Sequence, residues 1–291
     1  MHENVNLIWR CGSWTMDLSK RPLIMGILNV TPDSFSDGYP DPADALARAR
    51  QLIADGADIV DIGGESTRPG SKSISTQQEL DRIAPITERM LREFDIPLSI
   101  DTQKAAVASW ATEQGVSIIN HVSGSLDLEA MLPTLENNDA GYIGMHMRAR
   151  PDVMQQRTNY INLLDTILED LTTMFESLEK ADVAPERILF DPGIGFGKTM
   201  QQCVTLLTNS QALFRSLKRP LLMGLSRKRW LTSLLQLGPG QRDAATASAS
   251  ALLPWPAVAI HRVHNVELVR HALILKGEIE NLGWNWEEKV Y

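Results

Sequence analysis

The feature of this chain that most constrains its fold is a repeated alternation of a short apolar run with a longer stretch of helical spacing. The apolar runs lie at residues 23–28, 59–62, 97–100, 117–119, 141–145, 188–190, 220–224 and 258–261. Runs of this length are typical of buried strands. Strands that alternate with helices form parallel sheets, and eight such units make a (β/α)8 barrel. The sequence therefore predicts an α/β fold, a single (β/α)8 TIM barrel of parallel strands, with a doubly wound open sheet as the alternative.

The segments between these runs set the expected helices and the boundaries of the barrel. Helices are expected near residues 42–54, 76–93, 103–114, 127–137, 159–181, 201–217 and 266–280, with one or two more between 229 and 254. No linker interrupts the pattern, so residues 21–281 are expected to form one barrel. Residues 1–20, which include Trp9 and Trp14, are expected to form an N-terminal arm or short hairpin, and residues 282–291 a C-terminal tail.

Composition excludes several classes of function. The chain has 291 residues, 43% of them apolar, and a formal net charge of −8, which argues against general binding of nucleic acid. Cys11 and Cys203 are its two cysteines and have no metal-ligand spacing, which indicates a reducing compartment. The sequence shows neither a signal peptide nor an apolar run long enough to cross a membrane. We therefore expect a cytoplasmic protein with small-molecule substrates and without nucleic-acid or membrane partners.

The stretch Asp191-Pro192-Gly193-Ile194-Gly195-Phe196-Gly197-Lys198 follows one of the predicted strands directly. Its alternating glycines let the backbone turn sharply and approach a flat ligand. The stretch is not a phosphate-binding P-loop, because that motif requires glycine at the position of Pro192. A glycine-rich turn in which Asp191 caps a local helix is the simpler interpretation of this stretch taken alone.

The same arrangement recurs along the chain, because nearly every predicted strand ends on a polar or ionisable residue. These strand-end residues are Asn29, Asp61, Asp101, Asn120, His146, Asp191, Lys228 and Arg262. Any one of them can be explained as a helix cap. In a barrel, however, all eight lie at the C-terminal rim, where active sites are built, and together they predict a functional site there.

The rim residues divide into two chemical sets. Asp101, Asn120 and Asp191 offer carboxylate and amide groups that suit the edge of a flat nitrogen heterocycle. Lys228, Arg262 and His264 follow the last two strands, where barrels often bind phosphate. The two sets together suggest a heterocycle that carries a phosphate or pyrophosphate. Asn29 can add an oxygen ligand for a magnesium ion held mainly by that pyrophosphate and by water. No zinc-ligand spacing or nucleophile motif is present.

At these residues the sequence resembles the dihydropteroate synthase family of pterin-binding TIM-barrel enzymes. The resemblance covers about residues 22–280. It rests on two long segments, 26–38 (GILNVTPDSFSDG) and 61–70 (DIGGESTRPG). Shorter motifs follow in the family's order at 100–102, 119–120, 145–147, 191–198, 226–228 and 262–264.

The resemblance implies an alkyl-transferring enzyme of folate biosynthesis. It would join 6-hydroxymethyl-7,8-dihydropterin diphosphate to para-aminobenzoate, releasing 7,8-dihydropteroate and pyrophosphate, with Mg2+ and as a homodimer. The family's pterin contacts correspond to Asp101, Asn120, Met145, Asp191 and Lys228, and its diphosphate and magnesium site to Asn29, Arg262 and His264. Its mobile loops correspond to Phe35 and Asp37 and to Thr67 and Arg68, and its para-aminobenzoate pocket to Phe35, Thr67, Phe196, Ser226 and Lys228. Asn29, Asp37, Thr67, Arg68, Lys228, Arg262 and His264 are then the expected catalytic set.

The sequence departs from the family pattern at a few positions near the rim. His121 and Asn265 replace acidic residues, Arg229 replaces a small residue, and residues 253–256 read Leu-Pro-Trp-Pro in place of a small helical stretch. These changes raise the hypothesis of altered sensitivity to sulfonamides, which imitate para-aminobenzoate in the family. The alternatives are a pterin-dependent methyltransferase and a non-catalytic pterin-binding paralogue.

Overall fold

The computed structural model describes residues 7–31 and 42–291, and its centre is a closed parallel barrel. The strands are β3 (Leu23–Asn29), β4 (Ile59–Gly63), β5 (Leu98–Thr102), β6 (Ile118–His121), β7 (Gly141–Met145), β8 (Ile188–Asp191), β9 (Leu221–Met223) and β10 (Val258–Val263). They pair in chain order, and β10 returns to pair with β3. The predicted (β/α)8 barrel is therefore confirmed, and the open sheet is wrong.

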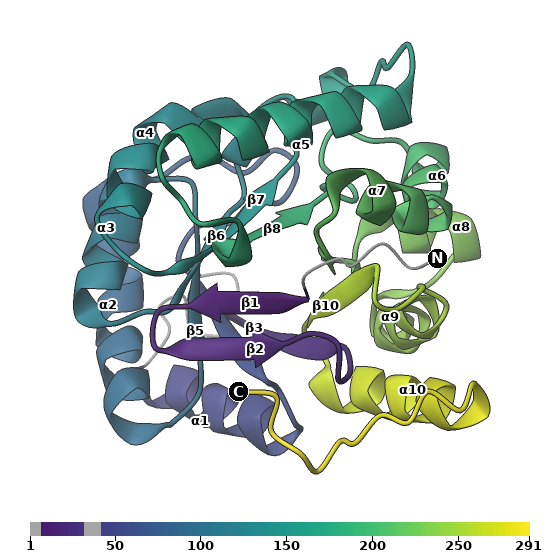
Figure 1. The fold of residues 1–291 in the computed structure, drawn as a ribbon, viewed down its shortest axis with the longest axis horizontal. Helices are drawn as coiled ribbons and strands as arrows, with labels where there is room; N and C mark the ends of the chain where they lie inside the picture. The colour runs from purple at the N-terminus through teal and green to yellow at the C-terminus, as the bar shows by residue number, and fades with distance from the viewer. Residues whose placement is uncertain (1–6, 32–41) are drawn as a thin grey trace.

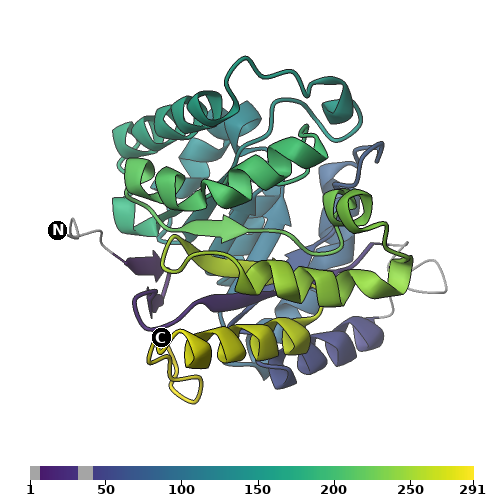
Figure 2. The ribbon, with the colours of Figure 1, turned by 90° about the vertical axis from the view of Figure 1, so that its right-hand side faces the viewer.

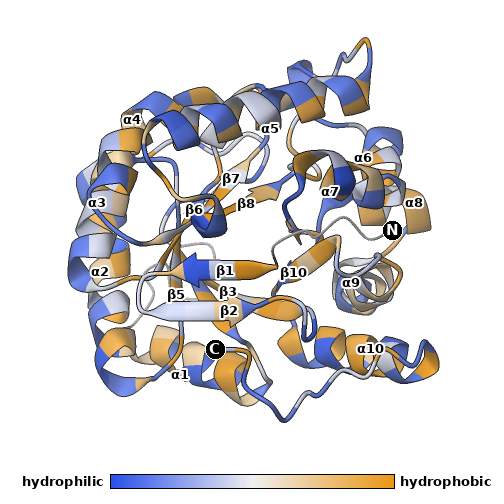
Figure 3. Cartoon of the chain, in the orientation of Figure 1, coloured by the Kyte–Doolittle hydropathy of each residue, from blue (hydrophilic) through white to orange (hydrophobic). Residues whose placement is uncertain are grey.

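Helices surround this barrel (Figure 1), and their apolar side chains are buried in two core clusters with residues of the strands. They are α1 (Pro42–Ala54), α2 (Thr76–Glu93), α3 (Ala105–Gln114), α4 (Gly124–Glu136), α5 (Leu163–Lys180), α6 (Met200–Thr208), α7 (Ser210–Leu217), α8 (Arg229–Leu235), α9 (Arg242–Ala251) and α10 (Val266–Ile279). Short 3-10 turns lie at Met154–Gln156, Pro185–Arg187 and Pro239–Gln241. The strands are mostly hydrophobic and the outer helix faces hydrophilic (Figure 3), as expected for strands buried on both faces.

Two of the predicted helices were placed incorrectly. The helix expected at 201–217 is two helices, because the Asn209 side chain donates to the carbonyl of Thr205 at 2.8 Å and ends α6 there. Such local hydrogen bonds from asparagine compete with helix continuation. The helix expected from residue 159 begins only at Leu163, where the Asn162 side chain accepts from the backbone of Asp165.

A hairpin covers the N-terminal end of the barrel. Strands β1 (Ile8–Cys11) and β2 (Trp14–Asp17) pair in antiparallel register. Trp9 is fully buried in a cluster with barrel-interior side chains such as Met25 and Ile143, and its indole N–H donates to the carbonyl of Arg187 at 3.0 Å. The described residues therefore fill the interior at this end, which leaves the opposite end as the place to look for a ligand site.

The last residues of the chain join this hairpin. The backbone N–H of Asp17 donates to the carbonyl of Val290 at 3.0 Å, and the Tyr291 ring meets Trp14 edge-on with centroids 4.8 Å apart. The hairpin and the C-terminal tail lie at the same end of the barrel (Figure 2).

The register of the sheet brings the predicted site residues to one level at the opposite end. Asn29 and Asp101 both lie opposite Gly63, and Asp101 lies opposite Asn120 on its other side. Met145 and Asp191 are paired in the same way. Because strands in a parallel barrel all run in one direction, these residues share the C-terminal rim.

Candidate active site

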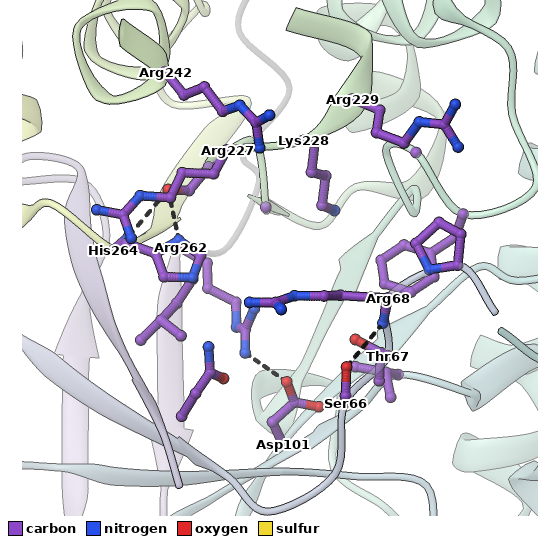
Figure 4. Close-up of a pocket in the computed structure, with 18 of the residues that line it drawn as sticks. Ser66, Thr67, Arg68, Asp101, Arg227, Lys228, Arg229, Arg242, Arg262 and His264 are labelled. Atoms are coloured by element: carbon purple, nitrogen blue, oxygen red, sulfur yellow. Dashed lines mark hydrogen bonds and ion pairs between the residues drawn. The ribbon is translucent and has the colours of Figure 1, made fainter. Parts of the chain in front are cut away.

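A cavity of about 1290 Å3 opens at the C-terminal rim of the barrel. Its lining includes every predicted site residue that lies within the described ranges: Asn29, Thr67, Arg68, Asp101, Asn120, Met145, Asp191, Phe196, Ser226, Lys228, Arg262 and His264. Figure 4 labels Thr67, Arg68, Asp101, Lys228, Arg262 and His264 among them. Phe35 and Asp37 lie outside the described residues. His146, which also ends a strand, is absent from the lining and is fully buried.

Arg262 joins the two sets of residues that the sequence kept apart. Its Nε donates to Asp61 Oδ2 at 2.6 Å. Its Nη2 donates to Asp101 Oδ2 at 2.5 Å, and Figure 4 shows this second bond. Asn120 Nδ2 also donates to Asp61 Oδ2, at 3.2 Å. The arginine side chain is 17% exposed, and Asp61 is completely buried, so this ion pair lies in a region of low dielectric constant.

Asp61 was missing from the predicted site, although it was noted as a strand end. Its role depends on a contact with Arg262 across 201 residues of sequence, which strand order cannot reveal. Its carboxylate orients both Arg262 and the amide of Asn120, so it is a supporting residue behind the cavity wall.

The carboxylate of Asp101 keeps an unused oxygen. Asp101 Oδ1 is buried and has no hydrogen-bond partner. Burial raises the pKa of Asp101 to about 7, against the opposing effect of the Arg262 guanidinium. Burial by itself would lower the pKa of Arg262, but Asp61 and Asp101 reverse this and raise it. An unpaired buried acceptor is costly, and Asp101 lines the cavity, so this oxygen is available to accept a hydrogen bond from a ligand.

Asp191 and Lys228 are neighbouring charges in the cavity lining, because a Cβ built on Gly224 would lie 3.6 Å from Asp191 Oδ2 and 3.4 Å from Lys228 Nζ. Asp191 Oδ1 accepts from the backbone N–H of Gly193 at 2.7 Å. Lys228 Nζ donates to the carbonyl of Ile194 at 2.6 Å and lies 4.6 Å from the centre of the Phe196 ring. Burial raises the pKa of Asp191, opposed by Lys228, and lowers the pKa of Lys228 to about 8, opposed by Asp191.

The turn that carries Phe196 requires its first glycine. Gly193 has a φ of 71°, and a Cβ there would lie 2.0 Å from the carbonyl oxygen of His146. No other residue fits in that space. The turn is therefore pressed against the end of β7, and Phe196, 8% exposed, is held at the cavity wall.

Ser226 and His264 form a neutral donor on the arginine side of the cavity. Ser226 Oγ accepts the backbone N–H of His264 at 3.1 Å and lies 2.9 Å from His264 Nδ1. The hydroxyl hydrogen can then be donated to Nδ1, which leaves the ring hydrogen on Nε2. Burial, together with Arg227 and Arg262, lowers the pKa of His264 to about 3, so the ring stays neutral.

The loop that carries Thr67 and Arg68 is anchored at its base. Glu65 Oε1 accepts from the backbone N–H of Ile74 at 2.9 Å, and Lys104 Nζ bridges Glu65 at 2.7 Å and Glu79 at 2.6 Å. Arg68 itself is exposed. The base of this loop is thus fixed by buried charges while its tip faces the cavity.

Further arginines stand at the mouth of the cavity. Arg227 forms two bonds to Asp243, both at 2.7 Å, and this clamp ties the loop after β9 to α9. Arg229 and Arg242 also line the cavity (Figure 4), and the buried Nε of Arg242 has no hydrogen-bond partner. Although the whole chain is acidic, its cavity is rich in cations, which suits an anionic ligand.

The donor set fits a weakly held magnesium ion and no structural metal. Among residues 7–31 and 42–291, no group of three His, Cys, Asp or Glu side chains could hold a metal ion. A Cβ built on Gly63 would lie 3.5 Å from Asn29 Oδ1 and 3.6 Å from Asp101 Oδ2, so hard oxygen atoms do face the same space. Magnesium commonly takes one or two such ligands and completes its shell with phosphate and water.

Two of the departures from the family pattern lie behind the cavity wall or at its edge. His121 is fully buried, with Nδ1 2.8 Å from the Tyr142 hydroxyl, and burial lowers its pKa to about 4. Asn265 caps α10 by accepting from the backbone N–H of Leu268 at 3.0 Å. Both Asn265 and Arg229 line the cavity, and Arg229 is the one of these departures that adds a positive charge there.

Within the described part of the chain, no helix is long and apolar enough to span a bilayer.

Comparison with known proteins supplies the family. Residues 25–264 match the model of the pterin binding enzyme family. The chain is 39% identical to the dihydropteroate synthase of Synechocystis over 88% of its length and 89% of the relative's. It is 37% identical to the Bacillus subtilis enzyme of the same name, over 92% of both chains.

Solved structures agree with the sequence relatives. The dihydropteroate synthase of Yersinia pestis, in complex with a sulfonamide drug, superposes with a TM-score of 0.85 at 37% identity, covering 94% of this chain and 99% of that one. The Xanthomonas albilineans dihydropteroate synthase with 4-aminobenzoic acid superposes with a TM-score of 0.87 at 34% identity, covering 94% and 98%. By sequence and by structure, the chain belongs to the dihydropteroate synthase family of pterin-binding transferases.

Proposed function

We propose that this enzyme condenses 6-hydroxymethyl-7,8-dihydropterin diphosphate with para-aminobenzoate to give 7,8-dihydropteroate and pyrophosphate. The observation that carries the proposal is a single cavity in which buried carboxylates face a concentration of cations. A heterocycle that donates hydrogen bonds at one end and carries a diphosphate at the other matches both halves. Structures of relatives contain 4-aminobenzoic acid and 7,8-dihydropteroate, which supports the same substrates here.

The pterin ring is assigned to the floor of the cavity. The unpartnered Asp101 Oδ1 and the carboxylate of Asp191 accept its N–H groups, and the amide of Asn120 supplies a mixed edge. Met145, 2% exposed, packs against the ring face. Lys228 lies between this floor and the para-aminobenzoate pocket. A ligand without these N–H groups would leave buried carboxylates unpaired, which provides specificity.

The diphosphate is assigned to Arg262, the Nε2–H of His264 and the Arg68 side chain. Asn29 would supply a protein ligand to magnesium, whose remaining ligands would be phosphate oxygens and water. When bound, magnesium neutralises charge on the phosphate oxygens. The residues themselves direct positive charge and a neutral donor toward the oxygen that leaves, and such preorganised groups stabilise developing charge.

Para-aminobenzoate is assigned to the wall formed by Phe196, Lys228, Thr67 and Ser226, together with Phe35, which lies outside the described residues. Its ring packs on Phe196, and its carboxylate faces the cations at the mouth. The arylamine nitrogen attacks the pterin methylene carbon, the carbon–oxygen bond breaks with its electron pair going to the diphosphate, and the nitrogen releases a proton. The amine is already a nucleophile, so the enzyme mainly positions it and excludes water. No covalent link to the protein is needed.

The test of this function is release of pyrophosphate with and without para-aminobenzoate. We expect release that depends on both substrates and on magnesium, together with formation of dihydropteroate. Release that is independent of para-aminobenzoate would indicate a hydrolase. Binding of the pterin without any release would support a non-catalytic paralogue.

We propose further that the enzyme is a homodimer. Helix α10 exposes Leu268, Leu275 and Ile279 along one face, and Leu252 at the end of the neighbouring α9 is 84% exposed. These helices pack together, and a second copy of the chain would cover their exposed apolar side chains. Sedimentation of the wild type and of a Leu252→Ser, Ile279→Ser variant tests this, because the variant should be monomeric.

The remaining proposals concern drug response and location. Sulfonamides are expected to compete for the para-aminobenzoate wall, with a sensitivity altered by Arg229. The two cysteines are free thiols, which supports a reducing compartment such as the cytoplasm.

A further inference from the structure

The glycine-rich turn ends in a lysine that the proposed chemistry does not use. Lys198 is 4% exposed. Its Nζ lies 3.0 Å from His146 Nδ1, 3.1 Å from the carbonyl oxygen of Phe196 and 3.4 Å from the carbonyl oxygen of His146. A lysine ammonium group has three hydrogens to donate. Three acceptors surround it, and none of them is a carboxylate.

His146 has to accept this bond rather than donate it. Its Nε2 lies 2.9 Å from Asp170 Oδ2, and a carboxylate can only accept, so the ring hydrogen is on Nε2. Burial, reinforced by Lys198, lowers the pKa of His146 to about 4, so Nδ1 carries a lone pair at neutral pH. Asp170 therefore fixes the tautomer that lets His146 receive a hydrogen from Lys198.

These contacts tie together three parts of the fold. His146 follows β7, Asp170 belongs to α5, and Phe196 and Lys198 belong to the turn after β8. Without the lysine, the carbonyl of Phe196 would lose the donor that joins it to the end of β7. Lys198 thus links the turn internally, through Phe196, and to the end of the adjacent strand β7, through His146.

The charges around Lys198 leave it near its point of titration. Burial lowers the pKa of Lys198 to about 7. Asp191 on β8, the Cys203 thiol on α6 and Asp170 on α5 act in the opposite direction, and Lys228 on the loop after β9 lowers the pKa further. Proton loss leaves two N–H donors for three acceptors, so the turn is held less firmly.

We propose that Lys198 is a positioning residue that fixes Phe196, and through it the aromatic ring of the second substrate, by a hydrogen-bond chain from Asp170 through His146 to the Phe196 carbonyl. This inference rests on the proposed function for the identity of that substrate. Lys198 lines the cavity, but the hydrogen bonds from its Nζ go to His146 and Phe196 and not to Asp191 or Arg262. Its charge does oppose the rise in the pKa of Asp191, so pterin affinity is measured beside the affinity for the arylamine, where the main effect is expected.

Steady-state kinetics of Lys198→Met and Asp170→Ala test the hydrogen-bond chain at both of its ends. Lys198→Met keeps an unbranched, flexible side chain that is one atom shorter, and it removes all three donors. We expect the KM for para-aminobenzoate to rise by about tenfold, as the loss of about one hydrogen bond in positioning implies, with kcat and pterin affinity within about twofold. Asp170 is half-exposed, so Asp170→Ala should fold. It frees the other tautomer of His146 and should raise the same KM to a smaller extent.

Lys276→Met is the matched control. Lys276 also has a buried stem and donates to a backbone carbonyl, that of Leu253, but it lies on α10 away from the cavity. Lys276→Met should lower stability without changing the KM for para-aminobenzoate.

In the wild type, the KM for para-aminobenzoate should rise as the pH increases through about 7, and the rise should be smaller in Lys198→Met. Equal losses in kcat and in both substrate affinities, or an unchanged KM, would overturn the positioning role.

Hydrogen exchange separates failure of this proposal from failure of the proposed function. Amides of residues 193–197 should exchange faster in Lys198→Met than in the wild type or in Lys276→Met, whether or not the enzyme makes dihydropteroate. Absence of turnover in the wild type would reject the proposed reaction alone. Unchanged exchange in the turn would reject the lysine's role alone.

Discussion

The Nη2 atom of Arg262 lies 2.5 Å from Oδ2 of Asp101, so a cation assigned to the diphosphate and a carboxylate assigned to the pterin are direct partners. The same guanidinium holds Asp61. Under these assignments, the pterin and diphosphate ends of the first substrate would be recognised by one ion-paired group, and a change at one end is expected to affect binding of the other.

Removal of Arg262 is expected to destabilise the fold as well as the ligand site. In Arg262→Ala the carboxylates of Asp61 and Asp101 stay buried without a cation, and such a loss costs about 3–5 kcal/mol. Urea denaturation measures this. Arg50→Ala, which breaks an exposed ion pair with Glu93, should change the midpoint little. Equal shifts in the two variants would show that the Arg262 ion pair adds no special stability.

Binding of a pterin that lacks the diphosphate should also weaken in Arg262→Ala, although less than binding of the diphosphate form, because Asp101 loses its orientation. The sequence alone predicts that binding of the diphosphate form weakens far more than binding of this pterin. Calorimetry with the two ligands decides between these outcomes.

Asp101→Asn and Asp191→Asn should each reduce pterin affinity by roughly tenfold to a hundredfold, since a charge-assisted hydrogen bond contributes about 1.5–3 kcal/mol. Asp81→Asn, on the exposed face of α2, is the control.

Burial raises the pKa of Asp101 to about 7, so the pterin affinity of the wild type should fall as the pH drops below that value and Asp101 takes up a proton. The Asp101→Asn variant should lose this dependence. A similar pH profile in both proteins would remove Asp101 from the pterin site.

Para-aminobenzoate is expected to bind weakly to the free enzyme and more tightly once pterin and pyrophosphate with magnesium are present. Thr67 and Arg68 stand on a loop whose base is fixed by Glu65 and Lys104 but whose tip is exposed, and such loops often close over a bound substrate. The coupling must be reciprocal. Titrations with and without the first ligand set measure it, and equal affinities would leave the loop without a role in ordering.

Arg229→Ser tests the hypothesis of altered drug sensitivity. A guanidinium at the mouth favours a full carboxylate charge over a neutral sulfonyl group. The variant should therefore raise the KM for para-aminobenzoate more than the inhibition constant of a sulfonamide, and become relatively more sensitive to the drug. Arg242→Ser is the comparison at the neighbouring arginine. If the ratio of the two constants stays the same in Arg229→Ser, the residue does not discriminate between the ligands.

Lys198 and Lys228 should both make stability depend on pH. Each has a pKa below the ordinary lysine value of 10.5, at about 7 and about 8 respectively. The folded protein therefore binds these protons more weakly than the unfolded chain does. The free energy of unfolding should rise with pH between about 7 and 10. Lys198→Met should show a shallower rise than the wild type in urea denaturation at several pH values, and parallel curves would contradict the assignment of Lys198 as a buried titrating group.

The sequence was sufficient for the barrel and for the direction in which its polar strand ends point. Alternating runs fix strand order, and parallel strands in a barrel must place Asp101, Asn120 and Asp191 at one rim. It was insufficient for contacts that depend on the reach of long side chains across the cavity. The pairing of Arg262 with Asp61 and the burial of Lys198 against His146 are of this kind. The helix break at Asn209 was also missed, because its cause is a local hydrogen bond that hydrophobic spacing does not report.

The backbone bond between Asp17 and Val290 has a consequence for how the molecule is assembled. It joins segments separated by almost the full length of the chain, and contacts of such long range are slow to form because the intervening loop must first be ordered. On a ribosome the eight barrel strands emerge before residue 290 does. The hairpin and the C-terminal tail are therefore expected to close the N-terminal end of the barrel in the final step of folding. The C-terminal rim of the barrel, with its cavity, is already in place by then.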